Sequence, residues 1–164
     1  MIETQTYADF SRIVHDVVNP LRIPVNGTIE VTNRCPLECA HCYNNLPMND
    51  AGARHRELSL DDHKRLLDEL FDLGCLWLLY SGGEIFARPD FLDIYRYAHA
   101  KGFLITLFTN ATLVTERVAD ALAQHPPFDI EVTLYGRTKA TYESLTGIPG
   151  SFEKCLRGIK LIRD

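Results

Sequence analysis

Apolar and polar positions along this chain follow two different periods, and the two kinds of stretch take turns. Short runs that are apolar, or that alternate apolar with polar residues, predict β-strands, whereas a period of about 3.6 residues predicts amphipathic helices. The predicted strands are 27–33, 76–80, 103–108 and 128–134. The predicted helices are 6–18, 59–74, 89–101, 114–124, 138–145 and a last one that starts at Ser151. This alternation favours parallel strands joined by right-handed crossovers.

Residues at the helix ends support these boundaries. Ser59 is a good N-cap, and Asp62 three residues later completes a capping-box pattern. Gly74 is typical of the position after a helix end, and Pro20 ends the first helix. We therefore expect residues 1–24 to form a helical lead packed on the body, and residues 25–164 to form one core domain.

Two of the predicted strands have one polar face. Along strand 128–134 the apolar face has Ile130, Val132 and Leu134, and the polar face has Asp129, Glu131, Thr133 and Tyr135. Strand 27–33 repeats the pattern, with Ile29 and Val31 opposed to Thr28, Glu30 and Thr32. Because a parallel sheet covered by helices on both sides has strands that are apolar on both faces, we infer a barrel with a polar lumen. Closed eight-stranded barrels fill their interior with bulky aliphatic side chains, so a partly open barrel of the α/β class fits better.

Three cysteines lie within one short loop directly after the first predicted strand. The loop reads Cys35-Pro-Leu-Glu-Cys39-Ala-His-Cys42-Tyr43, so its thiols are four and then three positions apart. Soft thiolate ligands favour iron–sulfur clusters, zinc or copper. A structural zinc site needs a fourth protein ligand, whereas three ligands leave one coordination position open for chemistry. The common bacterial ferredoxin spacing, Cys-x-x-Cys-x-x-Cys, is different.

The other groups with evident chemistry fall at the C-terminal ends of predicted strands. Gly82-Gly83-Glu84 follows strand 76–80, Thr109-Asn110 ends strand 103–108, and Tyr135-Gly136 follows strand 128–134. Ligands gather at this edge of parallel α/β folds. The cysteine loop therefore shares one rim with three further groups, which predicts a single binding site.

The cysteine loop resembles the Cys-x-x-x-Cys-x-x-Cys motif of the radical S-adenosylmethionine (SAM) enzymes, with His41 where that family usually has an aromatic residue. The resemblance implies that Cys35, Cys39 and Cys42 hold three irons of a [4Fe–4S] cluster, and that the amino and carboxylate groups of SAM chelate the fourth iron. It also implies a partial (β/α)6 TIM-like barrel. About four strand–helix units are visible, so we expect the chain to stop before strands five and six.

Gly82-Gly83-Glu84 resembles the second signature of the same family, which binds the amino group of SAM. Two residues without Cβ let the backbone approach the methionyl part of the ligand, and a carboxylate faces its ammonium. A tight turn with a solvated Glu84 is the alternative. The resemblance places four further residues beside the cofactor: His41, Tyr43, Asn110 and Thr133.

Two of these residues have a second interpretation, and one expected contact is missing. His41 lies between two ligands and has the chemistry to bind metal, but a packing role beside the adenine is favoured. Asn110 matches a family turn near the cofactor, and a turn role alone is the alternative. Many relatives have an arginine for the SAM carboxylate where this chain has Thr146.

The region of the fourth strand indicates the substrate class. Residues 131–136, 141–147 and 150–152 resemble the peptide- and protein-modifying (SPASM-type) radical SAM maturases, which carry a cysteine-rich C-terminal extension. The resemblance implies an oxidoreductase that cleaves SAM reductively to methionine and a 5′-deoxyadenosyl radical, which abstracts hydrogen from a peptide or protein. A reductase, flavodoxin or ferredoxin would donate the electron. The alternatives are an enzyme of small-molecule cofactor biosynthesis and a non-catalytic cluster- or SAM-binding module or fragment.

Composition indicates which partners and which cellular compartment to expect, but says little about the function. No apolar run approaches the about 20 residues of a membrane span, so no membrane partner is expected. The net charge of −5 argues against a broad nucleic-acid footprint. Five cysteines, an odd number with three in one loop, argue against a disulfide framework and for a reducing, cytoplasmic location.

We assign no catalytic or ligand-binding role to the polar segment 44–58 or to the other two cysteines. The polar segment 44–58 is expected to be a solvated connection, with substrate contact as the alternative. Cys75 precedes a buried strand and Cys155 lies on an apolar helix face, so both are interpreted as core residues. Zinc bound with Cys75 as the fourth ligand is the remaining alternative.

Overall fold

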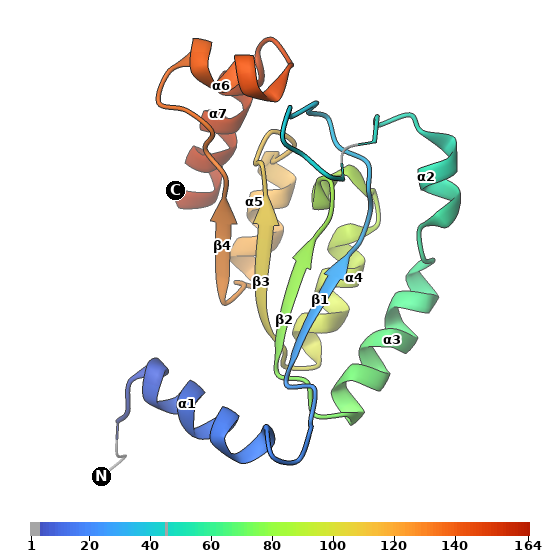
Figure 1. Cartoon of the computed structure of the whole chain (residues 1–164), viewed down its shortest axis with the longest axis vertical. Helices are drawn as coiled ribbons and strands as arrows, with labels where there is room; N and C mark the ends of the chain where they lie inside the picture. Colours follow the sequence, from blue (N-terminus) through green and yellow to red (C-terminus); the bar gives the residue numbers. More distant parts are fainter. Residues whose placement is uncertain (1–3, 45) are drawn as a thin grey trace.

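The fold is an α/β arrangement built on one parallel sheet (Figure 1). The structure, a computed structural model, describes residues 4–44 and 46–164. Its four strands lie in the order β1-β2-β3-β4, and each pairs in parallel with the next. They are β1 Asn26–Glu30, β2 Trp77–Ser81, β3 Leu104–Thr109 and β4 Asp129–Val132. The described strands do not close into a barrel, and the predicted succession of strand–helix units is confirmed.

Seven α-helices and one short 3-10 helix connect and flank these strands within the described residues. The helices are α1 Tyr7–Val18, α2 Ala51–Arg56, α3 Leu60–Asp72, α4 Phe91–Ala100, α5 Glu116–Gln124, α6 Lys139–Thr146, α7 Ser151–Arg163 and the 3-10 helix η1 Ile85–Ala87. The capping box of α3 forms as predicted, because the Ser59 and Asp62 side chains exchange hydrogen bonds with each other's backbone.

Helix α2 corrects the prediction that residues 44–58 are only a connection. The Asp50 side chain caps this helix by accepting a hydrogen bond from the backbone of Ala53 at 2.6 Å. Its sequence, Ala-Gly-Ala-Arg-His-Arg, has no apolar stripe, and only Ala53 is buried. Periodicity therefore gave no signal for α2, whereas the cap residue did.

One face of the sheet carries the hydrophobic core. Side chains of this face pack against helices α3 to α5, and large buried members of the core include Leu67, Leu78, Tyr80, Phe91, Ile94, Tyr95, Ile105 and Leu107. Burying one such side chain stabilises the fold by about 1.5–3 kcal/mol. The core therefore fixes the four strands side by side, and their C-terminal ends meet along one rim.

The opposite face of the sheet is polar and largely exposed, as predicted from the alternation. Thr28, Glu30 and Glu131 are exposed there, whereas Ile29 on the other face is buried. Two predicted positions are wrong: Thr32 is buried and Leu134 is 45% exposed. The cause is that β1 ends at Glu30 and β4 at Val132, so strand alternation no longer governs the residues that follow.

Helix α1 lies at the N-terminal ends of the strands, away from the cysteine loop (Figure 1). Its aromatic side chains contact the body: the Tyr7 ring lies 4.8 Å from that of Phe128, and the His15 ring stacks on Trp77 at 5.2 Å. A cavity of about 350 Å³ lies between α1 and the polar face of the sheet. Among the described residues, no helix combines the length and the apolar character that crossing a membrane requires.

Candidate functional site

The loop after β1 brings its three cysteines to one cavity of about 190 Å³. Cys35 and Cys39 are buried, each with 8% exposure, and Cys42 is exposed. The exits of β2, β3 and β4 supply the other walls. Predicted site residues that line this cavity are Cys35, Cys39, Cys42, Tyr43, Gly82, Gly83, Asn110 and Thr133. The structure thus brings together every predicted site residue except His41 and Glu84, which lie beside the cavity without lining it.

The glycine pair is needed where the exits of β1 and β2 meet. A Cβ at Gly82 would lie 2.3 Å from the Thr32 carbonyl oxygen, and one at Gly83 would lie 2.5 Å from that of Arg34. Gly82 also has a φ of 141°, which L side chains rarely adopt. The backbone N–H of Gly83 donates to Thr32 O at 2.7 Å. Close backbone packing therefore requires glycine here, independently of any ligand.

Glu84 is buried behind the cavity wall and is 1% exposed. Its carboxylate accepts hydrogen bonds from the Thr109 hydroxyl at 2.7 Å, the Asn110 backbone N–H at 2.8 Å and the Phe86 backbone N–H at 3.3 Å. Burial raises the pKa of this carboxyl group, and the hydrogen bonds oppose that rise. Glu84 therefore joins the turn after β2 to the end of β3, which differs from the solvated turn residue of the alternative interpretation.

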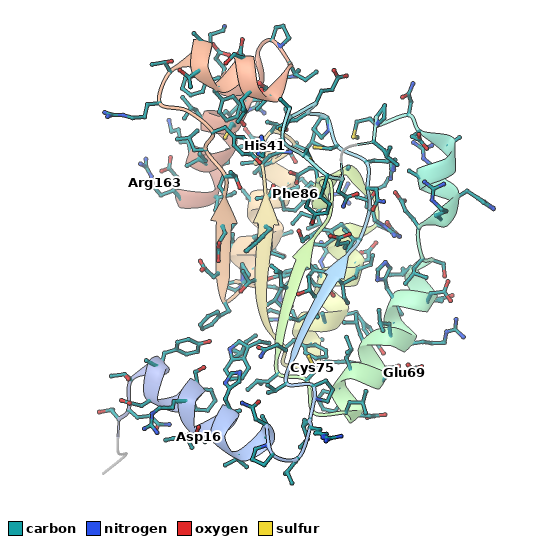
Figure 2. All side chains as sticks on the ribbon, viewed as in Figure 1. Asp16, His41, Glu69, Cys75, Phe86 and Arg163 are labelled. Atoms are coloured by element: carbon teal, nitrogen blue, oxygen red, sulfur yellow. The ribbon has the colours of Figure 1, made fainter. Side chains whose placement is uncertain are left out.

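Two side chains of the cysteine loop extend toward neighbouring strands. The exposed ring of His41 meets the ring of Tyr135 edge-on, with centroids 4.9 Å apart. Tyr43 is 87% exposed, and its hydroxyl donates to Glu30 at 3.0 Å. This hydrogen bond raises the pKa of Tyr43. Figure 2 shows His41 near the C-terminal ends of the strands.

Tyr135 also lines the cavity, and the sequence placed it at this rim without assigning it a contact with the cofactor. It lies two positions after Thr133 on the polar side of the fourth-strand pattern, which was the available signal. Burial is the main cause that raises its pKa. Phe108, on the exposed face of β3, and Ser81, at the end of β2, line the cavity as well and were missed.

The C-terminal end of α6 supports the cysteine loop, which sequence reasoning did not find. The backbone N–H of Glu38 donates to Thr146 O at 2.9 Å, and that of Ala40 donates to Leu145 O at 3.0 Å. Thr146 is fully buried, and its hydroxyl lies 2.9 Å from that of Ser151. The residue at the expected arginine position thus belongs to the packing beneath the loop.

A largely buried ion pair between Arg34 and Glu57, whose side chains are 3% and 12% exposed, anchors the chain directly before Cys35. The Arg34 Nε donates to Glu57 Oε1 at 2.7 Å and its Nη2 donates to Oε2 at 3.1 Å. The Thr32 hydroxyl also donates to Glu57. Burial acts to raise the pKa of Glu57, but the hydrogen bonds from Arg34 and Thr32 outweigh it and the pKa is lowered. The segment after α2 is therefore tied to the start of the cysteine loop.

The remaining two cysteines are core residues, as predicted. Cys155 is fully buried on α7, and Cys75 is 6% exposed. Cys75 precedes β2, at the end of the sheet opposite His41 (Figure 2), and its thiol lies 3.4 Å from Trp77 O. Its position speaks against the zinc alternative, since Cys75 is remote from the cysteine loop.

The donor set fits a cluster with one cysteine for each of three irons. Burial raises the pKa of Cys35 to about 12 and also raises the pKa of Cys39. Burial thus disfavours the thiolate form of these two cysteines. Coordination to a metal cation favours the thiolate, because it deprotonates the thiol, and so offsets the effect of burial. Within residues 4–44 and 46–164, no three potential ligands are close enough to share one ion, and a cluster does not require them to, because each cysteine binds a different iron.

Comparison with known proteins assigns this arrangement to a family. The profile of the radical SAM superfamily matches residues 29–164. The chain belongs to the radical SAM superfamily. The AdoMet-dependent heme synthase of Methanosarcina barkeri is 34% identical over 134 residues, which are 82% of this chain and 38% of that protein. The PqqA peptide cyclase of Rhodopseudomonas palustris is 34% identical over 148 residues, 90% of this chain and 38% of that protein.

Solved structures confirm the radical SAM fold. The crystal structure of Streptococcus suis SuiB bound to S-adenosylmethionine superposes with a TM-score of 0.67 at 18% identity, over 98% of this chain and 35% of that one. Native anSMEcpe with bound AdoMet gives 0.68 at 17% identity, over 85% of this chain and 41% of that one. Radical SAM proteins use a [4Fe–4S] cluster and SAM. This chain spans less than half the length of these relatives.

Proposed function

We propose that this chain carries the cluster- and SAM-binding site of a radical SAM enzyme that acts on a peptide or protein. The observation that supports this most directly is the single cavity lined by Cys35, Cys39 and Cys42 together with the exits of the other three strands. Cys35, Cys39 and Cys42 would hold the cluster, which would supply one electron for the cleavage of SAM to methionine and a 5′-deoxyadenosyl radical. That radical would take a hydrogen atom from the substrate.

The residues of this chain bind, orient and shield the reactants. Cys35, Cys39 and Cys42 are the proposed iron ligands. Gly82 and Gly83 present backbone to the cavity, and we propose that this wall receives the methionyl end of SAM. We also assign Glu84 to the SAM-binding residues. Its carboxylate accepts a hydrogen bond from the Asn110 backbone and so fixes the position of Asn110 in the cavity wall.

The remaining predicted residues line or border the same cavity. Tyr43, Asn110 and Thr133 line it directly. His41 packs against Tyr135, which lines it too. We propose that Thr133 approaches the ribose and that the aromatic pair borders the adenine. These side chains would also exclude water from the reacting atoms.

Several relatives support a peptide or protein substrate. The mycofactocin maturase MftC of Mycobacterium tuberculosis is 31% identical over 149 residues, 91% of this chain and 37% of that protein. SuiB has also been solved bound to the precursor peptide SuiA. Likeness to the AdoMet-dependent heme synthase favours the second candidate, a small-molecule radical enzyme. Incubation with peptides encoded beside the gene, followed by mass spectrometry, separates the two candidates.

We further propose that the electron comes from a reductase, flavodoxin or ferredoxin and that the protein works in the cytoplasm. None of the five cysteines, all of which the structure describes, is joined in a disulfide, which suits a reducing compartment. The net charge of −5 argues against a broad surface for nucleic-acid binding. A reduced flavodoxin that supports SAM cleavage at a rate comparable to that of a chemical reductant would agree with this proposal.

The decisive experiment is anaerobic cluster reconstitution followed by reduction in the presence of SAM. Methionine and 5′-deoxyadenosine in equal amounts are expected, detected by chromatography. A bound cluster without SAM cleavage would instead assign the chain to the non-catalytic binding modules.

A matched pair of cysteine variants tests the ligand assignment. Cys39→Ala removes a proposed ligand and should abolish the visible absorption of the intact cluster, because one iron loses its protein sulfur. Cys75→Ala removes a buried thiol outside the cavity and should leave the iron content unchanged. Full iron content in Cys39→Ala would contradict the assignment.

A further inference from the structure

The side-chain amide of Asn110 has one fixed orientation. Its Oδ1 accepts a hydrogen bond from the Thr112 backbone N–H at 3.0 Å and another from the Thr112 hydroxyl at 2.6 Å. A backbone N–H can only donate, so the atom it meets must be the amide oxygen and not the nitrogen. The amide nitrogen therefore points the other way, into the cavity.

The atom that this nitrogen meets is the sulfur of Cys35. Asn110 Nδ2 lies 3.5 Å from Cys35 Sγ, across 75 positions of the chain. The backbone N–H of Leu37 approaches the same sulfur at 3.5 Å. Cys35 is 8% exposed, so water competes little with these two donors. The sulfur of one proposed iron ligand thus receives a donor from the segment that follows β3.

Asn110 is also held from behind. Its backbone N–H donates to Glu84 Oε2 at 2.8 Å, while the Thr109 hydroxyl donates to Glu84 Oε1 at 2.7 Å. The backbone N–H of Ala111 donates to the Thr109 hydroxyl at 2.9 Å. The buried carboxylate therefore fixes the backbone from which the Asn110 amide extends.

We infer that Asn110 sets the reduction potential of the cluster through an N–H···S hydrogen bond to Cys35, with Glu84 as the residue that positions it. This inference rests on the proposed function, because it concerns Cys35 as an iron ligand. A hydrogen bond to a ligating sulfur stabilises the more negative, reduced state of a cluster and so raises its potential. Asn110 thereby makes the cluster easier to reduce, in addition to lining the cavity.

Two neutral variants separate this role from a turn role. Asn110→Ser keeps an acceptor for the Thr112 backbone and loses the amide donor, whereas Asn110→Ala loses both. Asn44→Ala is the matched control, because the side-chain amide of Asn44 contacts Glu30 and its backbone contact to Cys42 survives the substitution. Glu84→Gln tests the positioning step while keeping the shape of the side chain.

The measurement is a redox titration of the reconstituted protein without SAM, followed by electron paramagnetic resonance. Asn110→Ser and Asn110→Ala should both shift the midpoint to more negative potential, Glu84→Gln should shift it less in the same direction, and Asn44→Ala should match the unmodified protein. Asn110→Ser with an intact cluster and an unchanged midpoint would overturn the inference, since only the turn would then matter.

A second measurement uses the unmodified protein and does not depend on the folding of a variant. Protein made with asparagine carrying ¹⁵N in the side-chain amide should show a weak ¹⁵N coupling to the reduced cluster in pulsed electron paramagnetic resonance. Absence of that coupling would overturn the inference. Failure of the unmodified protein to bind any cluster would overturn the proposed function instead, so the two failures are distinguishable.

Discussion

Single residues at the rim of the sheet combine structural and chemical duties. Gly82 and Gly83 allow the exits of β1 and β2 to pack backbone against backbone, and Glu84 joins the exits of β2 and β3. A motif that reads as ligand-binding in the sequence is therefore also the device that assembles the rim. A side chain at either glycine would therefore disturb the backbone that leads into the cysteine loop, whether or not a ligand is bound.

Gly83→Ala tests this structural duty. The added Cβ would lie 2.5 Å from the Arg34 carbonyl oxygen, and overpacking of this kind costs about 1–3 kcal/mol. We expect a lower unfolding free energy for the metal-free protein in urea titrations. Gly52→Ala is the control, because its Cβ would meet only the far ends of flexible side chains in α2. Equal stability of the two variants would show that the backbone at Gly83 yields easily.

At the scale of elements, the cysteine loop depends on two segments distant from it in the sequence. Helix α6 accepts hydrogen bonds from the loop backbone at its C-terminal end. The segment after α2 holds Arg34 through Glu57, in contacts that span 23 positions of the chain. The loop is thus clamped at its start and at its middle, which preorganises the three thiols.

The Arg34–Glu57 pair predicts a dependence of stability on pH. The folded pKa of Glu57 lies below its ordinary value of 4.5, so the pair stabilises the fold above that pH and the contribution is lost as pH falls through the folded pKa. Urea titrations of the metal-free protein should show this acid loss, and Glu57→Gln should reduce the slope.

A matched control accompanies that pH series. Asp61→Asn removes a carboxylate whose side chain is 92% exposed, and screening makes such groups weak contributors. Its stability should follow the pH dependence of the unmodified protein. A Glu57→Gln slope identical to the Asp61→Asn slope would show that the pair contributes nothing to acid stability.

At the scale of the whole molecule, the two ends of the strands have different tasks. The C-terminal ends form the rim with the cysteine cavity, and α1 covers the N-terminal ends (Figure 1). Trp77 lies under α1, with its ring 6.1 Å from that of Phe10 and 5.2 Å from that of His15. The polar face of the sheet thus extends from the cavity beside α1 to the cysteine cavity at the rim.

Trp77 reports whether α1 is docked, because it is the single tryptophan of the chain. Phe10→Asp places a charge on the face of α1 that meets Trp77, and we expect the helix to detach and the fluorescence maximum to move to longer wavelength as water reaches the ring. Phe71→Asp, at a 51% exposed position on α3, should leave the maximum in place. An unchanged maximum in Phe10→Asp would mean that α1 contributes nothing to the environment of Trp77.

Much of the fold and of the site was predictable because local signals carry them. The Ser59 capping box and the position of the cysteine loop after β1 formed as predicted, and so did the alternating strand faces except at Thr32 and Leu134. Contacts between distant segments were not predictable. No local sequence pattern around Glu57 indicates that it pairs with Arg34, and none around Thr146 indicates that it accepts a hydrogen bond from Glu38. The contact between Tyr135 and His41 was missed for the same reason, because it forms only once β4 lies beside the cysteine loop.

The unequal exposure of the three cavity thiols has a consequence for handling the protein. Cys42 is exposed whereas Cys35 and Cys39 are buried. Oxidants and alkylating reagents attack accessible sulfur first, so damage in air should begin at Cys42 and spread inward. A brief treatment of iron-free protein with iodoacetamide, read by peptide mapping, should mark Cys42 well before its two neighbours.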